Sequence, residues 1–481
     1  MNLALYPYLT ARYEPGRPAI EQDGNMVTYG QLEGLSRRIA LGLRNAGIGK
    51  GALLGLILRD DALHLAALFA IWRLGAILLP LDWRAAQAEL DLVASRFSFT
   101  AVLAAKTLRG PKGVRQLDFE ALAATGDAEL PVMPLDNEAA LYALSSGTTG
   151  EPKAVVITHR QHNARLMAYA ISYPLLRTDR YLSTLPVAYN WGRNLAISNL
   201  CLGATVILHP TLLQPEDLVR AVDRSKATTL AVVPNVSRGL MRLPRGGRRL
   251  MEGLRLYVSS GAPLFAEERK ALRHAVAANL TETYGSTETG AICFLHPEEQ
   301  DLAPQSVGRP VSGVEIDVVD DAGRPLDRGA VGRVRVRGPG VASGYLRGTA
   351  EDAARFRGDS FHASDHGRLD EAGFLHLEGR YGDMVKQGGF SVYPAEIERV
   401  LGSHPAVAEA AVVGMPFPEL GEAVVAFVVL REAIDTRLLF NHCRITLAST
   451  KQPRQIKVVE SMPRSPAGKV LKSALVASLG Q

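Results

Sequence analysis

LSSGTTGEPK, residues 144–153, is the most informative stretch of this 481-residue chain. It follows the apolar run 139–143 and holds two serines, two threonines and two glycines before Lys153. Glycine lets a loop turn its backbone N–H groups inward and hydroxyl groups add further donors, so this composition suits close approach to phosphate. It is not the Walker loop G-x-x-x-x-G-K-[ST], because Pro152 takes the place of the second glycine and Ala154 that of the Ser or Thr. A kinase or ATPase that depends on a Walker loop is therefore disfavoured.

The size and composition predict a globular protein with at least two domains. A single hydrophobic core stops growing at roughly 250–300 residues, and this chain is longer. A hydrophobic content of 47% with 21% charged residues is typical of soluble globular proteins. The net charge of +5 comes with no nucleic-acid recognition motif, so we expect no nucleic-acid partner. The three cysteines form no CxxC pair, which favours neither a disulfide framework nor a zinc site and fits a reducing cytoplasm.

Two segments bear on membrane targeting. Residues 1–18 lack the basic start and continuous apolar core of a secretory signal. Residues 62–80 are the most membrane-like stretch, yet they carry His64 and Arg73 and barely reach spanning length. We therefore expect a buried helix running into a buried strand at 62–80, and a cytoplasmic protein without a membrane span.

Apolar runs of strand length alternate with helical patterns such as residues 31–47 through most of the chain. This alternation predicts an α/β fold of mostly parallel sheets flanked by helices. The expected strands lie at 52–59, 76–82, 204–210, 228–234 and 254–261.

The pattern changes twice in the last third of the chain. After about residue 305, short strands and turns predict a small antiparallel, β-barrel-like region, with examples at 314–326, 332–340 and 373–380. After Arg380, strand, helix and strand signals predict a compact α+β domain of about 100 residues. We therefore expect a large N-terminal domain over 1–380, a small C-terminal domain over 381–481 and a hinge near 380–383.

Further motifs follow the opening loop in a fixed order: SSGAPL (259–264), TYGSTETG (283–290), SDHGRLDEAGFLHLEGR (364–380), YGDMVKQGGFSVYPAEIE (381–398) and PRSPAGKVLKSAL (463–475). Together they cover essentially the whole chain and resemble the adenylate-forming superfamily of acyl-CoA synthetases, peptide-synthetase adenylation domains and firefly luciferase. The resemblance implies an acid–thiol ligase that uses ATP and Mg²⁺ to form an acyl-adenylate. The acyl group then passes to CoA or to the phosphopantetheine arm of a carrier protein, after rotation of a mobile C-terminal domain.

The implied ATP site needs positive charge and oriented donors, because a carboxylate must attack a phosphate and charge grows in the transition state. The resemblance places the β- and γ-phosphates in the opening loop, at Ser145, Ser146, Gly147, Thr148, Thr149, Gly150 and Lys153. It extends the ATP site to Ser260, Gly261, Ala262, Pro263, Thr283, Tyr284, Gly285, Ser286, Asp365 and Arg380.

Individual roles follow from the same resemblance. Tyr284 is expected to stack on adenine, Thr287 to bind the α-phosphate and Glu288 to hold Mg²⁺, a hard cation that takes oxygen ligands. Asp365 is expected to bind the ribose diol with its two acceptor oxygens, although Ala363-Ser364 precedes it in place of the usual Thr-Gly. Lys469 is the expected catalytic lysine, bridging the substrate carboxylate and the α-phosphate.

The thiol step is assigned to the start of the C-terminal domain. The resemblance brings Gln387, Gly388, Gly389 and Phe390 to the thiol tunnel. It places the pivot at Gly382, where relatives usually have aspartate or lysine. Glycine has the widest choice of backbone angles, so rotation stays feasible without that side chain.

The substrate pocket is expected around LPVAYNWGRN, residues 185–194, with contacts at Tyr189, Asn190, Trp191, Arg193, Ser259 and Gly285. No acidic residue occurs between Pro186 and Asn194 to pair with an α-ammonium, so amino acids are disfavoured. Asn190 between two flat aromatic side chains favours an aryl acid. A second substrate carboxylate on Arg193 ranks third, because an exposed arginine at this position needs no special explanation. Free CoA is favoured over a carrier protein as acceptor, and the acid and the oligomeric state stay open.

Overall fold

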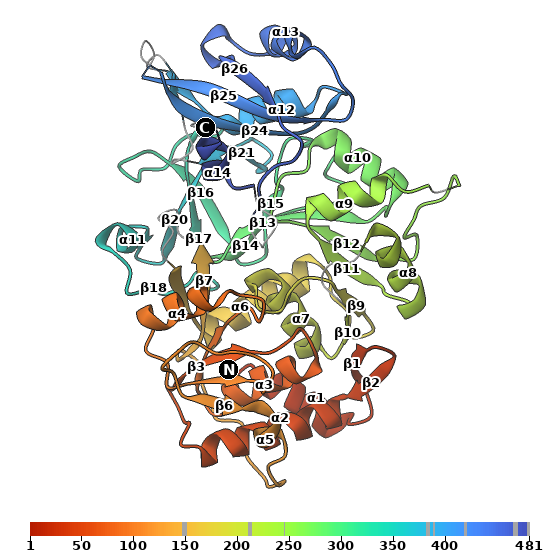
Figure 1. Cartoon of the computed structure of the whole chain (residues 1–481), viewed down its shortest axis with the longest axis vertical. Helices are drawn as coiled ribbons and strands as arrows, with labels where there is room; N and C mark the ends of the chain where they lie inside the picture. Colours follow the sequence, from red (N-terminus) through yellow and green to blue (C-terminus); the bar gives the residue numbers. More distant parts are fainter. Residues whose placement is uncertain are drawn as a thin grey trace.

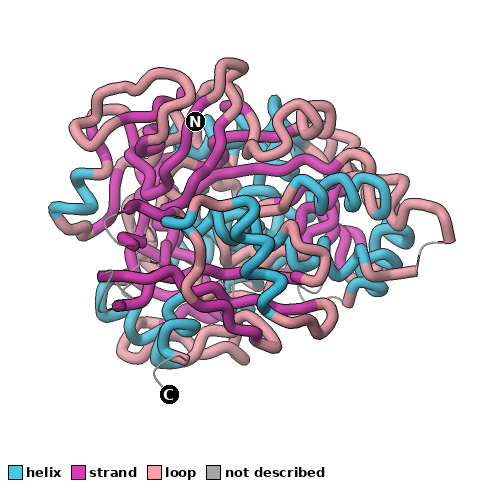
Figure 2. The backbone as a smooth tube through the Cα atoms, turned by 90° about the horizontal axis from the view of Figure 1, so that it is seen from above, coloured by secondary structure: helices cyan, strands magenta, loops and turns pink. Residues whose placement is uncertain are grey.

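The computed structural model describes residues 1–146, 152–209, 214–244, 246–380, 385–387, 390–417, 421–464 and 470–478. Figure 1 shows the N-terminal residues at one end of the long axis and the C-terminal residues at the other, with an antiparallel sheet between them. Figure 2 shows that many connecting loops lie at the periphery of the molecule.

The first large sheet is mostly parallel. Its described strands are β1 (Pro18–Gln22), β2 (Asn25–Thr28), β9 (Arg180–Ser183), β10 (Thr205–Leu208), β11 (Thr229–Val232), β12 (Leu256–Ser259), β13 (Leu280–Ser286), β14 (Gly290–Leu295) and β15 (Arg309–Pro310). Their order is β15-β14-β13-β12-β11-β9-β10-β1-β2. The six strands from β13 to β1 run parallel, and β2, β14 and β15 are antiparallel additions at the two edges.

The second large sheet carries the opening motif at one side. Its described strands are β3 (Leu53–Ile57), β4 (Ile77–Pro80), β5 (Ala101–Ala104), β6 (Gln116–Asp118), β7 (Ala139–Ser146), β8 (Pro152–Thr158) and β18 (Gly344–Leu346). Their order is β18-β8-β7-β4-β3-β5-β6. The five strands from β7 to β6 are parallel, while β8 and β18 add antiparallel pairs. The predicted α/β architecture of mostly parallel sheets is thereby confirmed.

Helices cover these sheets and connect their strands (Figure 1). They are α1 (Leu5–Tyr13), α2 (Tyr29–Asn45), α3 (Ala62–Arg73), α4 (Gln87–Arg96), α5 (Phe119–Ala123), α6 (His159–Ser172), α7 (Asn190–Leu202), α8 (Pro215–Ser225), α9 (Pro234–Met241) and α10 (Ala266–Ala275). Helix α11 (Ala350–Ala354) lies beside β18, and α12 (Pro394–Gly402), α13 (Thr436–Thr446) and α14 (Lys472–Ala477) belong to the C-terminal part.

The segment 62–80 forms a buried helix followed by a buried strand, as the sequence predicts. Helix α3 begins where the side chain of Asp61 accepts a hydrogen bond from the backbone N–H of His64, which satisfies one of the free donors of the first turn. Its two polar side chains, His64 and Arg73, are both buried. Among the described residues, no helix combines the length and the apolar character needed to cross a membrane.

The region after residue 305 is antiparallel, as predicted. It consists of β16 (Glu315–Val319), β17 (Gly332–Arg337), β19 (Phe356–Arg357), β20 (Ser360–Leu369) and β21 (Leu375–Arg380). Apolar side chains of these strands pack on Ile292 and Cys293 of β14, so this sheet lies against the edge of the first large sheet.

The C-terminal part has a sheet and a hydrophobic core of its own. Its described strands are β22 (Val385–Gln387), β23 (Phe390–Val392), β24 (Val407–Phe417), β25 (Gly421–Leu430) and β26 (Gln455–Val458). The core includes Ile397 of α12, Val424 of β25 and Leu439 of α13. The hinge near 380–383 stays a prediction, since residues 381–384 lie outside the described residues.

Candidate active site

The opening motif spans the connection between β7 and β8. Residues 147–151 lie outside the described residues, and with them Gly147, Thr148, Thr149 and Gly150; of Ser145 and Ser146 only the backbone is described. These two serines pair with Lys153 and Pro152 across the antiparallel β7–β8 ladder. The motif therefore begins and ends on neighbouring strands at one end of a sheet.

Lys153 is the charged side chain described in this motif, and it forms an ion pair with Asp352 of α11. The Nζ–Oδ1 distance is 2.7 Å, and the side chains are 24% and 5% exposed. Asp352 also accepts hydrogen bonds from the backbone N–H and the hydroxyl of Thr349. Burial raises the pKa of Asp352, but the bonds from Lys153 and Thr349 outweigh it and leave the pKa below its usual value. The motif lysine is thus held by a carboxylate far away in the sequence.

The segment TYGSTETG leaves strand β13 and turns into β14. A Cβ atom on Gly285 would lie 2.3 Å from the carbonyl oxygen of Gly290, so only glycine fits this close approach. Gly290 itself has φ +76°, which suits the reversal of the chain. The Ser286 and Thr289 hydroxyls lie 3.1 Å apart and link the two sides of the turn.

Arg165 of α6 fixes the backbone of the turn between β13 and β14. Its guanidinium donates to the carbonyls of Thr287 at 3.0 Å, Glu288 at 2.7 Å and Gly340 at 2.7 Å. The side chain is buried, and burial lowers its pKa to about 10, which still leaves it charged at neutral pH. A cation therefore contacts the backbone of the two residues assigned to the α-phosphate and the metal.

Glu288 is buried, and its two carboxylate oxygens differ: one accepts a hydrogen bond and the other, called here the open oxygen, accepts none from the described residues. Its Oε1 accepts a hydrogen bond of 2.6 Å from the hydroxyl of Tyr345, and among the described residues no hydrogen bond reaches Oε2. The described residues contain no group of three or more His, Cys, Asp or Glu side chains able to hold a metal. A single open carboxylate oxygen suits Mg²⁺, which usually keeps several waters and binds one or two carboxylates together with substrate phosphates.

Asp365, Tyr284 and Arg380 come together at the edge between two sheets. Asp365 lies on β20 opposite Arg380 on β21, and the Arg380 Nε donates to its Oδ1 at 3.0 Å. The hydroxyl of Tyr284 donates to the other oxygen at 2.6 Å. Burial, and then the negative charge of Asp365, raise the pKa of Tyr284, so the phenol stays protonated as a donor. Three residues that the sequence assigned to one nucleoside site are therefore in direct contact.

The SSGAPL segment runs from the end of β12 to the start of α10. Ser259 is buried, the Ser260 hydroxyl donates to the carbonyl of Thr283 at 2.8 Å, and Gly261 has φ +92°. Ala262 is partly buried, while Pro263 accepts a hydrogen bond from Arg238 at 3.2 Å. These contacts place the segment beside the strand that carries Thr283 and Tyr284.

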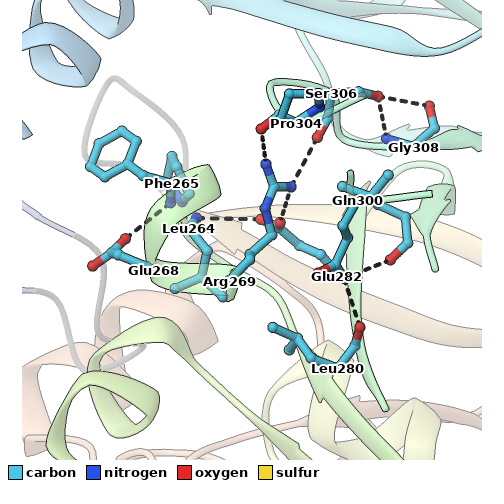
Figure 3. Close-up of polar contacts among 12 residues, drawn as sticks. Leu264, Phe265, Glu268, Arg269, Leu280, Glu282, Gln300, Pro304, Ser306 and Gly308 are labelled. Atoms are coloured by element: carbon cyan, nitrogen blue, oxygen red, sulfur yellow. Dashed lines mark hydrogen bonds and ion pairs between the residues drawn. The ribbon is translucent and has the colours of Figure 1, made fainter. Parts of the chain in front are cut away.

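A buried ion pair secures this region (Figure 3). Arg269 of α10 binds Glu282 of β13 at 2.8 Å and also donates to the carbonyls of Ser306 and Pro304. Glu282 in turn accepts from the backbone N–H of Leu264, the last residue of SSGAPL. Burial raises the pKa of Glu282, and attraction to Arg269 opposes this. One pair thus ties α10, β13 and the SSGAPL segment together.

The segment 185–194 forms a loop and the first turn of α7. Tyr189 is hydrogen-bonded to Asp82, and burial together with Asp82 raises its pKa to about 12. Trp191 packs against the main hydrophobic core. The backbone N–H of Val187 donates to Asp60 at 2.7 Å, which fixes the loop before the helix.

Arg193 is buried, so the expectation of an exposed arginine was wrong. Its side chain donates to the carbonyls of Val187 and Ala188 and to the Oδ1 of Asn190. It lies on the inner side of α7, where these acceptors offset part of the cost of burying its charge. Among the described residues, Arg193 therefore fixes the loop that precedes α7. It also occupies the side-chain oxygen of Asn190, which accepts its hydrogen bond.

The C-terminal residues of the predicted site are described only in part. Lys469, Gly382, Gly388 and Gly389 lie outside the described residues, and of Phe390 only the backbone is described. Gln387 is buried, and its amide bonds the carbonyls of Thr450 and Gln452 and the N–H of Val424. Its side chain therefore joins elements of the C-terminal part, so any contact with a thiol would come from its backbone.

Asp352, Tyr345 and Arg165 were not predicted from the sequence. Asp352 had a local signal, because Thr349 and Asp352 have the spacing of a helix capping box and form one. Tyr345 and Arg165 act over distances of 57 and at least 122 residues, and no local pattern marks them.

The chain matches the family described as "AMP-binding enzyme" over residues 9–346 and "AMP-binding enzyme C-terminal domain" over residues 396–469. It belongs to the AMP-binding enzyme family. This confirms the predicted membership in the adenylate-forming superfamily.

Three relatives of this AMP-binding enzyme span nearly its full length. It is 31% identical to the indoleacetate–CoA ligase of Aromatoleum aromaticum, over 96% of this chain and 95% of the relative. It is 32% identical to the fatty acid–[acyl-carrier-protein] ligase ScoC of Streptomyces coeruleorubidus, over 97% and 94% of the two chains. The structure of O-succinylbenzoate coenzyme A synthetase from Bacillus subtilis with ATP and magnesium matches with a TM-score of 0.88 and 27% identity, over 98% and 99% of the chains.

Proposed function

We propose that this protein is an ATP- and Mg²⁺-dependent acid–thiol ligase that makes acyl- or aryl-CoA thioesters. A substrate carboxylate attacks the α-phosphate of ATP and displaces pyrophosphate, and a thiol then displaces AMP from the acyl-adenylate. The observation that supports the proposal is that Lys153 and Glu288 both contact Tyr345, and Asp365 bonds Tyr284 and Arg380, in a chain of the AMP-binding enzyme family. The full-length relatives include CoA ligases.

The proposed roles of the residues are those that the resemblance to the adenylate-forming superfamily implies. Lys153 and the rest of the opening motif bind the β- and γ-phosphates, and Asp365 accepts hydrogen bonds from the ribose. Thr287 donates to the α-phosphate, while Glu288 offers its open oxygen to Mg²⁺. When bound, Mg²⁺ supplies positive charge beside the phosphates. Lys469 is the proposed catalytic lysine, and residues 387–390 the approach for the thiol.

For the substrate we propose an aryl or arylalkyl carboxylic acid. Tyr189, Asn190 and Trp191 are the proposed contacts, and the amide nitrogen of Asn190 is the group left to meet a polar substituent, because its oxygen accepts from Arg193. The similarity to an indoleacetate–CoA ligase supports an aryl acid. A second substrate carboxylate on Arg193 is disfavoured, since loop carbonyls and Asn190 already occupy its guanidinium.

The second candidate is transfer of the acyl group to a carrier protein. The similarity at 32% identity to a ligase whose name specifies an acyl-carrier protein favours it. The two candidates share the adenylate-forming step and differ only in the thiol, CoA or the phosphopantetheine arm.

The test is acid-dependent exchange of pyrophosphate into ATP over a panel of aryl, fatty, dicarboxylic and amino acids. We expect the highest rates with aryl acids, and Lys469→Ala should lower the rate at least about a hundredfold, as loss of one transition-state donor does in other enzymes. Thioester formation with CoA or with a phosphopantetheinylated carrier protein then identifies the acceptor. Exchange with none of these acids, or a Lys469→Ala variant as active as the parent, would contradict the proposal.

A further inference from the structure

We infer that Tyr345 is a positioning residue for Glu288: it holds one carboxylate oxygen so that the other is presented to Mg²⁺. The inference rests on the proposed function, in which Glu288 is the metal ligand. It assigns a task to a residue that lies outside the motifs at 283–290 and 144–153, and it explains how the carboxylate keeps one orientation.

Glu288 is fixed at both its backbone and its side chain. Its carbonyl accepts from Arg165 at 2.7 Å and from the N–H of Ala342 at 2.8 Å. Its carboxylate accepts from the Tyr345 hydroxyl at 2.6 Å, a short bond of the kind that charged acceptors form. With the backbone and one carboxylate oxygen held, the direction of the open oxygen is set before any metal arrives.

The surroundings of Tyr345 keep its hydroxyl oriented as a donor to Glu288. The Nη1 of Arg355 donates to the same hydroxyl oxygen at 3.3 Å, which directs the phenol proton toward the carboxylate. The ring packs edge to face on Phe356, with centroids 5.4 Å apart.

Tyr345 also borders the phosphate motif. It lies on β18, which pairs with β8 so that Tyr345 stands opposite Val155, two residues beyond Lys153. The Nζ of Lys153 is 5.9 Å from the centre of the tyrosine ring, within the range of a cation–π contact. A single side chain therefore contacts both the proposed metal ligand and the proposed phosphate lysine.

The experiment compares the parent with Tyr345→Phe, which removes the hydroxyl and leaves the ring. Calorimetric titration without acid gives the dissociation constant of ATP with excess Mg²⁺ and with EDTA in its place. We expect Tyr345→Phe to raise the Mg·ATP constant about 10- to 100-fold, as loss of a hydrogen-bond partner of a metal ligand does, and to leave the EDTA constant within about twofold. The matched control is Tyr6→Phe on α1, whose hydroxyl donates to Asn163 at 2.8 Å outside this cluster; both constants should equal those of the parent.

The outcomes separate this inference from the proposed function. If Tyr345→Phe raises both constants equally, or neither, Tyr345 has only a structural role and the inference is wrong. Glu288→Gln tests the proposed function itself: an unchanged Mg·ATP constant would remove Glu288 as a metal ligand. A raised Mg·ATP constant in Glu288→Gln with parental constants in Tyr345→Phe would overturn the inference alone.

Discussion

Replacement of Arg165 by methionine is expected to loosen the turn that carries Thr287 and Glu288. The arginine donates three hydrogen bonds of 2.7–3.0 Å to backbone carbonyls. In the variant, the carbonyl of Glu288 still accepts a hydrogen bond from the N–H of Ala342. The carbonyls of Thr287 and Gly340 are therefore the ones that lose a hydrogen-bond partner. A buried polar group left without a partner costs about 1–3 kcal/mol.

The net effect on stability is smaller than the sum of these bonds. Removing a buried guanidinium also removes the cost of taking its charge out of water, which is several kcal/mol for an ion. We therefore expect Arg165→Met to lower the free energy of unfolding by about 2–4 kcal/mol, a large share of the 5–15 kcal/mol typical of native proteins. The KM for Mg·ATP should rise about tenfold or more, because two groups that meet the nucleotide lose their fixed backbone.

Urea unfolding and acid-dependent pyrophosphate exchange measure the two effects. The matched control is Arg160→Met, an exposed arginine on the same helix, which should change neither quantity. An Arg165→Met variant with a free energy of unfolding within about 0.5 kcal/mol of the parent and an unchanged KM would refute the assigned role, since a surface substitution has that small an effect.

Two further variants test other parts of the site. Arg269→Met should lower the free energy of unfolding by about 3–5 kcal/mol because Glu282 is left charged and buried, and adding Glu282→Gln should recover part of that loss; additive effects in urea unfolding would contradict the pairing. Asn190→Ala should change the order of exchange rates among substituted benzoates, because it removes the amide that faces a ring substituent in the proposed pocket; an unchanged order would remove Asn190 from the pocket.

Features with a local pattern were predictable from the sequence. The five apolar runs became β3, β4, β10, β11 and β12, since a parallel strand buried on both faces needs a continuous apolar stretch. Asp365 and Arg380, assigned to one nucleoside site, pair across two adjacent strands of a hairpin, which short-range geometry allows.

Features set by long-range packing were not predictable from the sequence. Lys153 and Asp352 are 199 residues apart, and nothing near either residue identifies the other. The burial of Arg193 depends on which face of α7 meets the core. The sequence does not reveal this face, because ten of the thirteen residues of α7 are buried and no polar face stands out. Tertiary structure decides such contacts, so the sequence identified the residues that meet the nucleotide better than those that hold them.

The charge balance of the described cluster bears on the role proposed for Lys469. Lys153, Arg355 and Arg165 carry three positive charges, and Asp352 and Glu288 carry two negative ones, so the cluster has one net positive charge before the nucleotide arrives. This near balance limits the cost of unpaired buried charge. The proposed Mg·ATP substrate brings net negative charge, and its reaction with a carboxylate adds more. One net positive charge does not balance these anions, so further positive charge is needed, and the proposed source is Lys469, which would supply a cation at the step where charge develops.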